Sequence, residues 1–154
     1  MAALAAAPMT VCAEEDPFSA ARDSVSLAQV ARNLQWSYRL LVVDKQVAAD
    51  QLQLLDRADL IERDLVVVTF GPRHITVGRA TSPGVRMEAF AIRDPSLPPG
   101  YAQALSSDGE TMRVLLIGKD GGVKAAWPSP PSQADLNAII DVMPMRAEEM
   151  RRGG

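Results

Sequence analysis

The alternation of apolar and polar positions divides the chain into a clear succession of helices and strands. Residues 27–34 place apolar side chains on one face of a helix, and Ser26 precedes them as a suitable cap. Residues 39–43 and 65–70 are short apolar runs, typical of strands buried on both faces, and residues 47–62 between them carry an apolar helical stripe. A strand, a helix and a strand of these lengths predict a parallel βαβ unit.

The last third of the chain predicts an antiparallel hairpin and a closing helix. Apolar runs over residues 112–117 and 122–127 flank an Asp-Gly-Gly turn. Ser132 then opens a capping box, and the helix behind it is expected to end at Pro144. Residues 71–98, in the middle, contain only short extended pieces and turn signals. A short helix over residues 99–105 follows them.

This order favours an α/β protein with a thioredoxin-like arrangement, in which a βαβ unit is followed by a β-hairpin and a closing helix. The sheet is expected to be mixed and to hold four or five strands. A flavodoxin-like fold is the second option, because it needs more parallel strands with a helix between each pair.

A single domain over residues 27–152 fits the length of 154 residues. Residues 14–26 are a polar lead-in, and residues 1–13 contain no charged side chain. We interpret residues 1–13 as a signal peptide cleaved after Ala13, which predicts a periplasmic or secreted protein. The pattern is incomplete, since no Lys or Arg precedes it and Pro8 interrupts it. The alternative is an Ala-rich tail on a cytoplasmic protein.

Composition and charge exclude some classes of partner. The formal net charge is −3 and the hydrophobic fraction is 47%, which gives no general attraction to nucleic acid. No apolar run approaches the roughly 20 residues that span a bilayer. The partner is expected to be an unidentified protein or a small ligand.

Thiol chemistry, the usual reaction of a thioredoxin-like fold, lacks its nucleophile here. The only cysteine is Cys12, and the turn after the first core strand, residues 44–48, contains none. Residues 109–113 also lack the proline that thioredoxins carry before their third core strand. His74 is the only histidine and cannot form a metal cluster alone. We therefore expect no catalytic residue, no cofactor and no metal, and favour a protein that is not an enzyme.

Three cations are candidate contacts for an anion or for an acidic group of a partner: Arg39, Arg113 and Lys119. Arg39 begins the first core strand and Arg113 lies early in the third, so the two are expected at one edge of the sheet. The more ordinary interpretation, which we favour, is a pair of surface arginines with local carboxylates such as Glu110. Trp36 and Tyr38 are expected to cover the entrance to the sheet. The charged residues 146–151 are expected to form a solvated helix, with docking on the domain or on a partner as the alternative.

The segments LLVV (40–43), LIERDLVVV (60–68), VLLIGKDGGVK (114–124) and IIDVMPMRAEEMR (139–151) together resemble the bacterial "domain of unknown function 4174" family. The resemblance covers residues 27–152. It implies a small exported protein, related to a domain in vertebrate extracellular matrix proteins and similar in fold to peroxiredoxins. It supplies no catalytic residues, and similarity of fold does not transfer an activity.

Three functions follow as hypotheses. The first is an exported, non-catalytic thioredoxin-like domain that acts as a binding or structural module. The second is a redox enzyme derived from a peroxiredoxin, which requires Cys12 to be retained near residues 44–48. The third is a small-anion binder that uses Arg39 and Arg113.

Overall fold

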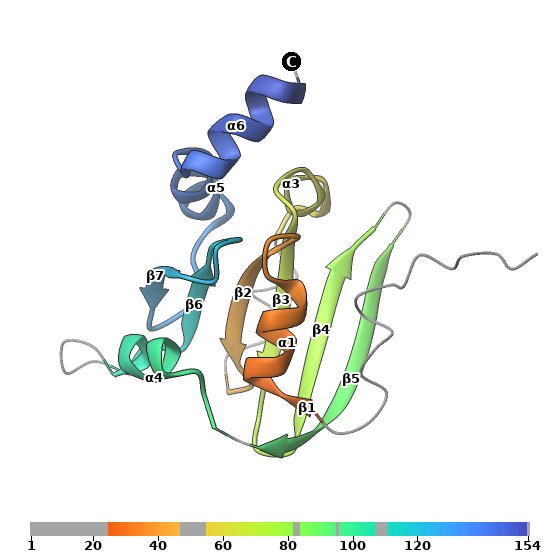
Figure 1. The fold of residues 1–154 in the computed structure, drawn as a ribbon, viewed down its shortest axis with the longest axis vertical. Coiled ribbons are helices and arrows are strands. Elements are labelled where there is room, and N and C mark those ends of the chain that lie inside the picture. Colours follow the sequence, from red (N-terminus) through yellow and green to blue (C-terminus); the bar gives the residue numbers. More distant parts are fainter. Residues whose placement is uncertain (1–24, 47–54, 82–83, 95, 107–110, 154) are drawn as a thin grey trace, which may run out of the picture.

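The computed structural model describes residues 25–46, 55–81, 84–94, 96–106 and 111–153. The predicted signal peptide, Cys12, Glu110 and residues 47–54 lie outside these ranges. The described residues form a mixed sheet with the strand order β1-β5-β4-β3-β2-β6-β7 (Figure 1). In chain order the elements are β1 (Val25–Ser26), α1 (Leu27–Leu34), β2 (Arg39–Asp44), α3 (Arg57–Glu62), β3 (Leu65–Phe70), β4 (His74–Ala80), β5 (Val85–Asp94), α4 (Pro99–Leu105), β6 (Val114–Ile117), β7 (Val123–Trp127), α5 (Gln133–Asp141) and α6 (Pro144–Gly153).

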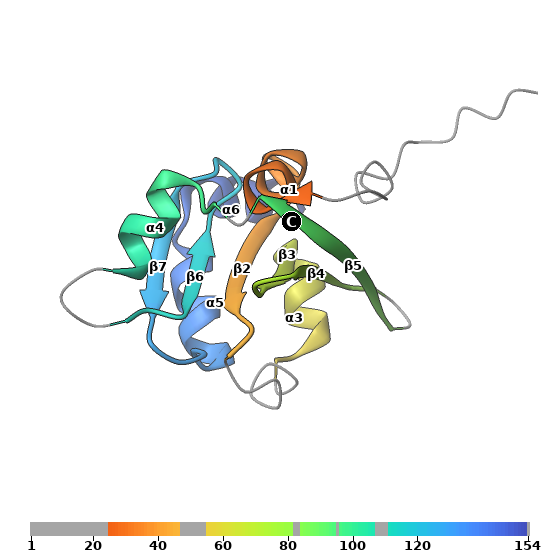
Figure 2. The ribbon, with the colours of Figure 1, turned by 90° about the horizontal axis from the view of Figure 1, so that it is seen from below.

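Strand β2 lies in the middle of the core. It pairs in parallel with β3 and antiparallel with β6, and its residues from Arg39 to Val43 are all buried. Side chains alternate between its two faces. Leu40 and Val42 pack in one apolar cluster, while Leu41 and Val43 pack in the other. Helices α1 and α4 cover the first face and α3 and α5 the second (Figure 2). The buried βαβ strands predicted from the sequence are confirmed.

The predicted caps and turns are also confirmed where the structure describes them. The Ser26 hydroxyl accepts a hydrogen bond from the backbone of Gln29 at 3.1 Å, and the Ser132 hydroxyl accepts one from Asp135 at 3.1 Å. Gly121 has a φ angle of 83° in the turn between β6 and β7, a conformation that a residue without Cβ adopts readily.

The strand number was predicted wrongly, because the sheet has seven strands rather than four or five. Residues 71–98, expected to contain only short extended pieces, hold the long antiparallel pair β4–β5. In β5, Val85 and Met87 are exposed apolar residues. Because these exposed positions are apolar, the sequence of β5 lacks the alternation of apolar and polar residues that marks a half-buried strand.

The helix predicted over residues 47–62 is described only from Arg57 to Glu62. The Asp56 carboxylate accepts a hydrogen bond from the Asp59 backbone at 3.0 Å and caps this helix at residue 57. No helix in the described part of the chain has both the length and the apolar character needed to cross a membrane.

Candidate functional site

Strands β2 and β3 begin at the same end of the sheet, and charged side chains gather at this end, where α6 lies (Figure 1). Charged residues are rarely buried unless they are paired. Four cations in this region are nevertheless each less than a tenth exposed. We call the group the charged cluster, and its members are Arg39, Arg63, Asp64, Lys119, Asp141, Arg146 and Glu149.

Glu149 of α6 lies between Arg39 and Lys119. The Lys119 ammonium donates to Glu149 Oε1 at 2.6 Å, and the Arg39 guanidinium donates to both carboxylate oxygens at 3.3 Å. Arg39, only 1% exposed, also donates to the carbonyl of Arg63 at 2.8 Å. Lys119 donates a second bond to Asp64 at 2.8 Å. Two cations thus donate hydrogen bonds to the Glu149 carboxylate, and the Arg146 guanidinium lies 3.7 Å from it.

These contacts keep Glu149 ionised. Burial opposes its ionisation, but the hydrogen bonds from Lys119 and Arg39 outweigh burial and lower the pKa of Glu149. The Glu149 side chain is 27% exposed. Its charge is therefore balanced by protein cations more than by solvent.

A second set of ion pairs joins α5 and α6 to the end of α3. Arg63 donates through Nε and Nη2 to the two oxygens of Asp141, at 2.9 Å each. The hydrogen bond from Arg63, partly opposed by burial, lowers the pKa of Asp141. Arg146 donates to the carbonyl of Glu62 at 3.0 Å and to its carboxylate at 2.5 Å. The bidentate pair between Arg63 and Asp141 fixes the relative orientation of the two side chains as well as their distance.

An open cavity of about 130 Å³ lies beside the charged cluster. Arg39 and Lys119 line it together with Lys124, which is paired with Asp120 at 2.7 Å. Its apolar lining comes from the junction of α5 and α6, at residues 143–145. The cavity therefore combines two cations of the cluster with an apolar wall.

Trp36 stands next to this region. Its backbone N–H donates to the carbonyl of Lys119 at 2.7 Å, its φ angle is 70°, and its side chain is 64% exposed. The expectation that Trp36 covers the entrance to the sheet is wrong. The same expectation for Tyr38 is confirmed, since Tyr38 packs against the core. A strained, exposed tryptophan is the kind of residue that takes part in recognition.

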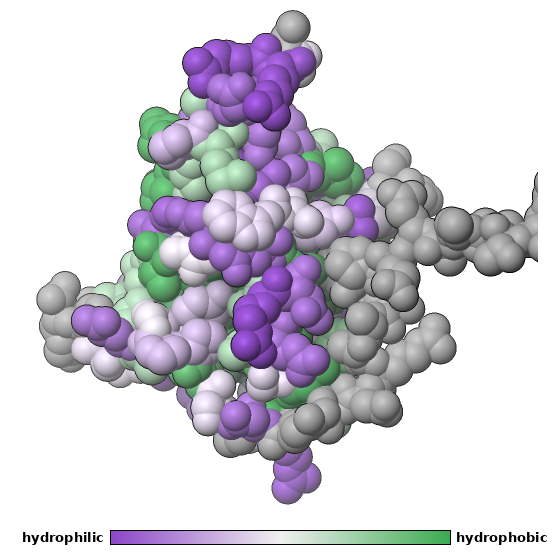
Figure 3. Space-filling model, in the orientation of Figure 1, coloured by the Kyte–Doolittle hydropathy of each residue, from purple (hydrophilic) through white to green (hydrophobic). Residues whose placement is uncertain are grey.

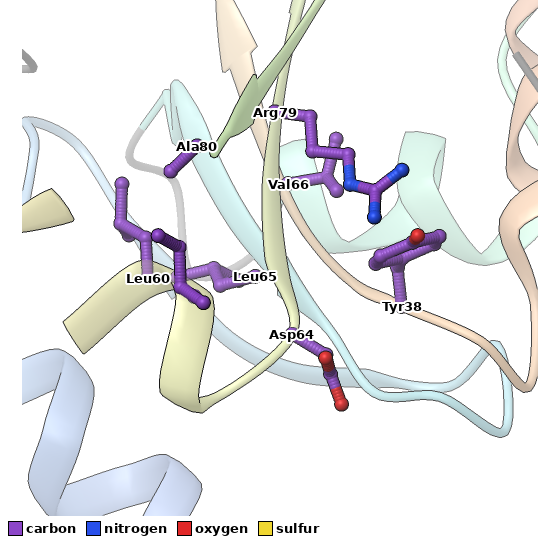
Figure 4. A pocket seen from close by; sticks show the side chains of 8 residues that line it. Tyr38, Leu60, Asp64, Leu65, Val66, Arg79 and Ala80 are labelled. Atoms are coloured by element: carbon purple, nitrogen blue, oxygen red, sulfur yellow. The ribbon is translucent and has the colours of Figure 1, made fainter. Parts of the chain in front are cut away.

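A smaller hollow of about 60 Å³ lies where β3 begins. Figure 4 shows Tyr38 and Arg79 on one side of β3 and Leu60 and Ala80 on the other. The Arg79 guanidinium lies 5.0 Å from the centre of the Tyr38 ring, a cation–π contact. Asp64 lines this hollow and also bonds Lys119, so it connects the hollow with the charged cluster.

Arg113 lies at the opposite end of the sheet from Arg39. Strands β2 and β6 are antiparallel, with Leu40 opposite Ile117 and Val43 opposite Val114, so the start of one strand meets the end of the other. Arg113 instead donates to Gln46 at 2.8 Å. The expectation that Arg39 and Arg113 share one edge is wrong, whereas Arg39 and Lys119 do come together.

Two further expectations need correction. Arg39 is buried, not a surface arginine. Residues 146–151 were expected to form a solvated helix, yet Arg146 is 5% exposed and docks on the domain. The sequence carried a signal for this docking, since Arg146 and Glu149 are three residues apart and therefore share a helix face. Their partners lie far away in the sequence, which no local pattern indicates.

His74 is exposed at the start of β4. Within the described ranges, no group of three or more His, Cys, Asp or Glu residues is placed to hold a metal ion.

Figure 3 shows that hydrophilic side chains cover the outer part of α6. The charged cluster and its cavity are therefore the strongest candidate for a functional site in the described part of the chain.

Comparison with protein-family models identifies the family of the chain. The model of a family described as a domain of unknown function (DUF4174) matches residues 30–149. The matched segment begins within α1 and ends at Glu149 of α6, so it includes every member of the charged cluster. No solved structure matches the chain.

Proposed function

The chain belongs to the DUF4174 family, and we propose that it is an exported, non-catalytic module with a thioredoxin-like fold that binds a small partner molecule. The observation that carries the proposal is the combination of a domain without a sulfur nucleophile and a cation-lined cavity at the start of its central strand.

The strand order supports the thioredoxin-like part of the proposal. Four neighbouring strands follow the order β3-β2-β6-β7, with β2 and β3 parallel and with β6 and β7 forming an antiparallel hairpin. Helix α5 follows the hairpin. This is the arrangement expected when a βαβ unit is joined to a hairpin and a closing helix. The pair β4–β5 and the short β1 extend the sheet on one side.

The chemistry at the end of β2 supports a non-catalytic role. A thioredoxin places its cysteine at the turn after this strand, at the start of the next helix. Here Asp44 accepts a hydrogen bond from the Gln46 backbone at 2.9 Å, and Arg113 bonds the Gln46 side chain. These polar groups satisfy one another, and none is a sulfur nucleophile.

The opposite end of β2 supports a binding role. It carries the cavity of about 130 Å³ and the exposed Trp36. Small-molecule sites are concave, largely apolar, and contain a few placed polar groups. This cavity shares that composition on a smaller scale, with the apolar residues 143–145 on one wall and Arg39, Lys119, Asp120 and Lys124 on another.

A peroxide-consumption assay tests the non-catalytic proposal. The full chain and its Cys12→Ser variant are compared with hydrogen peroxide as oxidant and dithiothreitol as reductant. We expect both to match the protein-free blank, because thiolate is the reactive species of the alternative enzyme. Consumption above the blank that disappears in Cys12→Ser would establish the peroxiredoxin-derived alternative instead.

Export is tested separately, by mass spectrometry of the protein recovered from a bacterial periplasm. The expected N-terminus is Glu14, as signal-peptidase cleavage after Ala13 would leave it. An intact chain that still contains Cys12 in the cytoplasm would contradict export.

The anion-binding alternative based on Arg39 and Arg113 is not favoured in that form. The two arginines lie at opposite ends of antiparallel strands, so one small anion cannot contact both.

A further inference from the structure

We propose that Arg39 and Lys119 form a carboxylate-binding site that Glu149 of α6 occupies as an internal ligand, and that a short-chain carboxylate can take the place of Glu149. The inference deepens the binding role proposed above and names the class of ligand. It rests on that role, and its test below is a binding measurement that does not depend on the outcome of the peroxide assay.

The two cations are built into the fold as a receptor. Arg39 is 1% exposed, and its orientation is fixed by the bond from Nη1 to the Arg63 carbonyl at 2.8 Å. Lys119 is 8% exposed and is held by the turn between β6 and β7, where the Gly118 N–H donates to the Gly122 carbonyl at 2.9 Å. Each cation therefore has a second partner besides Glu149, which is the Arg63 carbonyl for Arg39 and the Asp64 carboxylate for Lys119.

Glu149 contacts the two cations of this receptor at unequal distances. Its bond from Lys119 is 2.6 Å long, but both of its contacts with Arg39 are 3.3 Å. Charge-assisted N–H···O bonds prefer about 2.7–2.9 Å. Within the described ranges, the buried Nε of Arg39 also has no hydrogen-bond partner. A carboxylate that is not attached to α6 is free to approach the guanidinium more closely than Glu149 does.

The cavity beside the receptor is small and open. Its volume is about 130 Å³. Its polar side is lined by Arg39, Lys119, Lys124 and Asp120, with Lys124 paired to Asp120 at 2.7 Å, and its apolar side by Met143, Pro144 and Met145. These properties suit a carboxylate with a short alkyl group, such as acetate, with the alkyl group against the methionines and the proline.

Binding of such a ligand competes with docking of α6. Among the described residues of α6, only Arg146 is buried, and Glu149 supplies the contacts of this helix with Arg39 and Lys119. An internal ligand acts at a high effective concentration. The unmodified chain is therefore expected to bind free carboxylate weakly, and removal of the Glu149 carboxylate should reveal the site.

Chemical rescue tests the proposal. The thermal midpoint of a Glu149→Ala variant is measured at pH 7 in sodium acetate and in sodium chloride of equal ionic strength, at about 0.1 M. We expect acetate to raise the midpoint by about 3 °C or more above the value in chloride, because a ligand selective for the folded state stabilises it. The unmodified chain should show no such difference.

Two further variants show where acetate acts. Glu148→Ala is the matched control, because Glu148 pairs only with the exposed Arg151 and Arg152 among the described residues, and it should respond like the unmodified chain. The double variant Lys119→Met with Glu149→Ala should lose the rescue. A Glu149→Ala chain that folds in acetate and not in chloride counts as rescue.

Equal midpoints in the two salts would overturn the proposal. So would rescue of the same size in Glu148→Ala or in the Lys119→Met double variant, and so would a Glu149→Ala chain that folds in neither salt. A second measurement is independent of the variants: amide hydrogen exchange of residues 144–153 in the unmodified chain should become faster as acetate is raised to molar concentrations, relative to chloride. Unchanged exchange would also contradict the proposal.

Discussion

Trp36 and Asp64 have positive φ angles of 70° and 48°, which non-glycine residues seldom adopt. Both contact Lys119, Trp36 through its backbone N–H and Asp64 through its carboxylate. An aspartate tolerates this conformation because its short polar side chain can form local bonds, whereas a tryptophan does not. The hydrogen bond from the Trp36 N–H to the Lys119 carbonyl therefore helps to hold this strained backbone in place, beside the proposed receptor.

Replacement of Trp36 tests this strain directly. Glycine normally destabilises a protein relative to alanine, but at a positive φ the order should reverse. We expect Trp36→Gly to be more stable than Trp36→Ala by about 1 kcal/mol, as measured by urea unfolding. Because the indole is 64% exposed, Trp36→Ala itself should cost little. A lower stability of the glycine variant would show that residue 36 is not strained.

Single residues also show how far the candidate site was predictable from the sequence. Arg39 and Lys119 stood out as charges beside apolar runs, and the structure brings them together. Arg113 was grouped with Arg39 by mistake, because the pairing of β2 with β6 was not available from the sequence. Glu149 was missed as the partner, since it is 110 residues from Arg39.

Helix α6 is held to the sheet by charge more than by apolar contact. Its buried residue is Arg146, and Glu149 joins it to Arg39 and Lys119. The pKa of Glu149 is lower in the folded chain than its ordinary value of 4.5. Its contribution to stability is therefore complete above about pH 4.5 and is lost as the pH falls through the lower folded pKa.

This linkage predicts a difference between two neighbouring glutamates. Between pH 7 and pH 3, Glu149→Gln should lose less stability than the unmodified chain, because the carboxylate that must be protonated is gone. Urea unfolding at several pH values measures this. Glu148→Gln is the control and should follow the unmodified chain, since Glu148 is 43% exposed and its described partners lie on the surface. Identical pH profiles for all three proteins would exclude Glu149 as the linked group.

For the molecule as a whole, the sequence predicted the parallel pair β2–β3, the hairpin β6–β7 and the closing helix. These elements have continuous apolar runs or explicit caps and turns. It failed for β4–β5, because one surface of β5 carries exposed apolar residues such as Val85 and Met87. It also failed for the docked α6, because burial of a charged helix depends on partners that only the complete fold supplies.

At the scale of the whole molecule, the two ends of strand β2 differ in the polar groups that surround them. At the end of β2, Asp44, Gln46 and Arg113 bond one another. At its beginning, Arg39 and Lys119 hold the carboxylate of the terminal helix beside a cavity. We therefore place the proposed binding site at the beginning of β2.

The most direct test of this account is a double-mutant cycle between Lys119 and Glu149. The free energies of unfolding of Lys119→Met, Glu149→Gln and the double variant are measured by urea unfolding at pH 7. Because the 2.6 Å pair is largely buried, we predict a coupling energy of about 1 kcal/mol or more. Single effects that add to within about 0.3 kcal/mol would contradict the account, since Glu149 would then be a surface glutamate and not the ligand of a receptor.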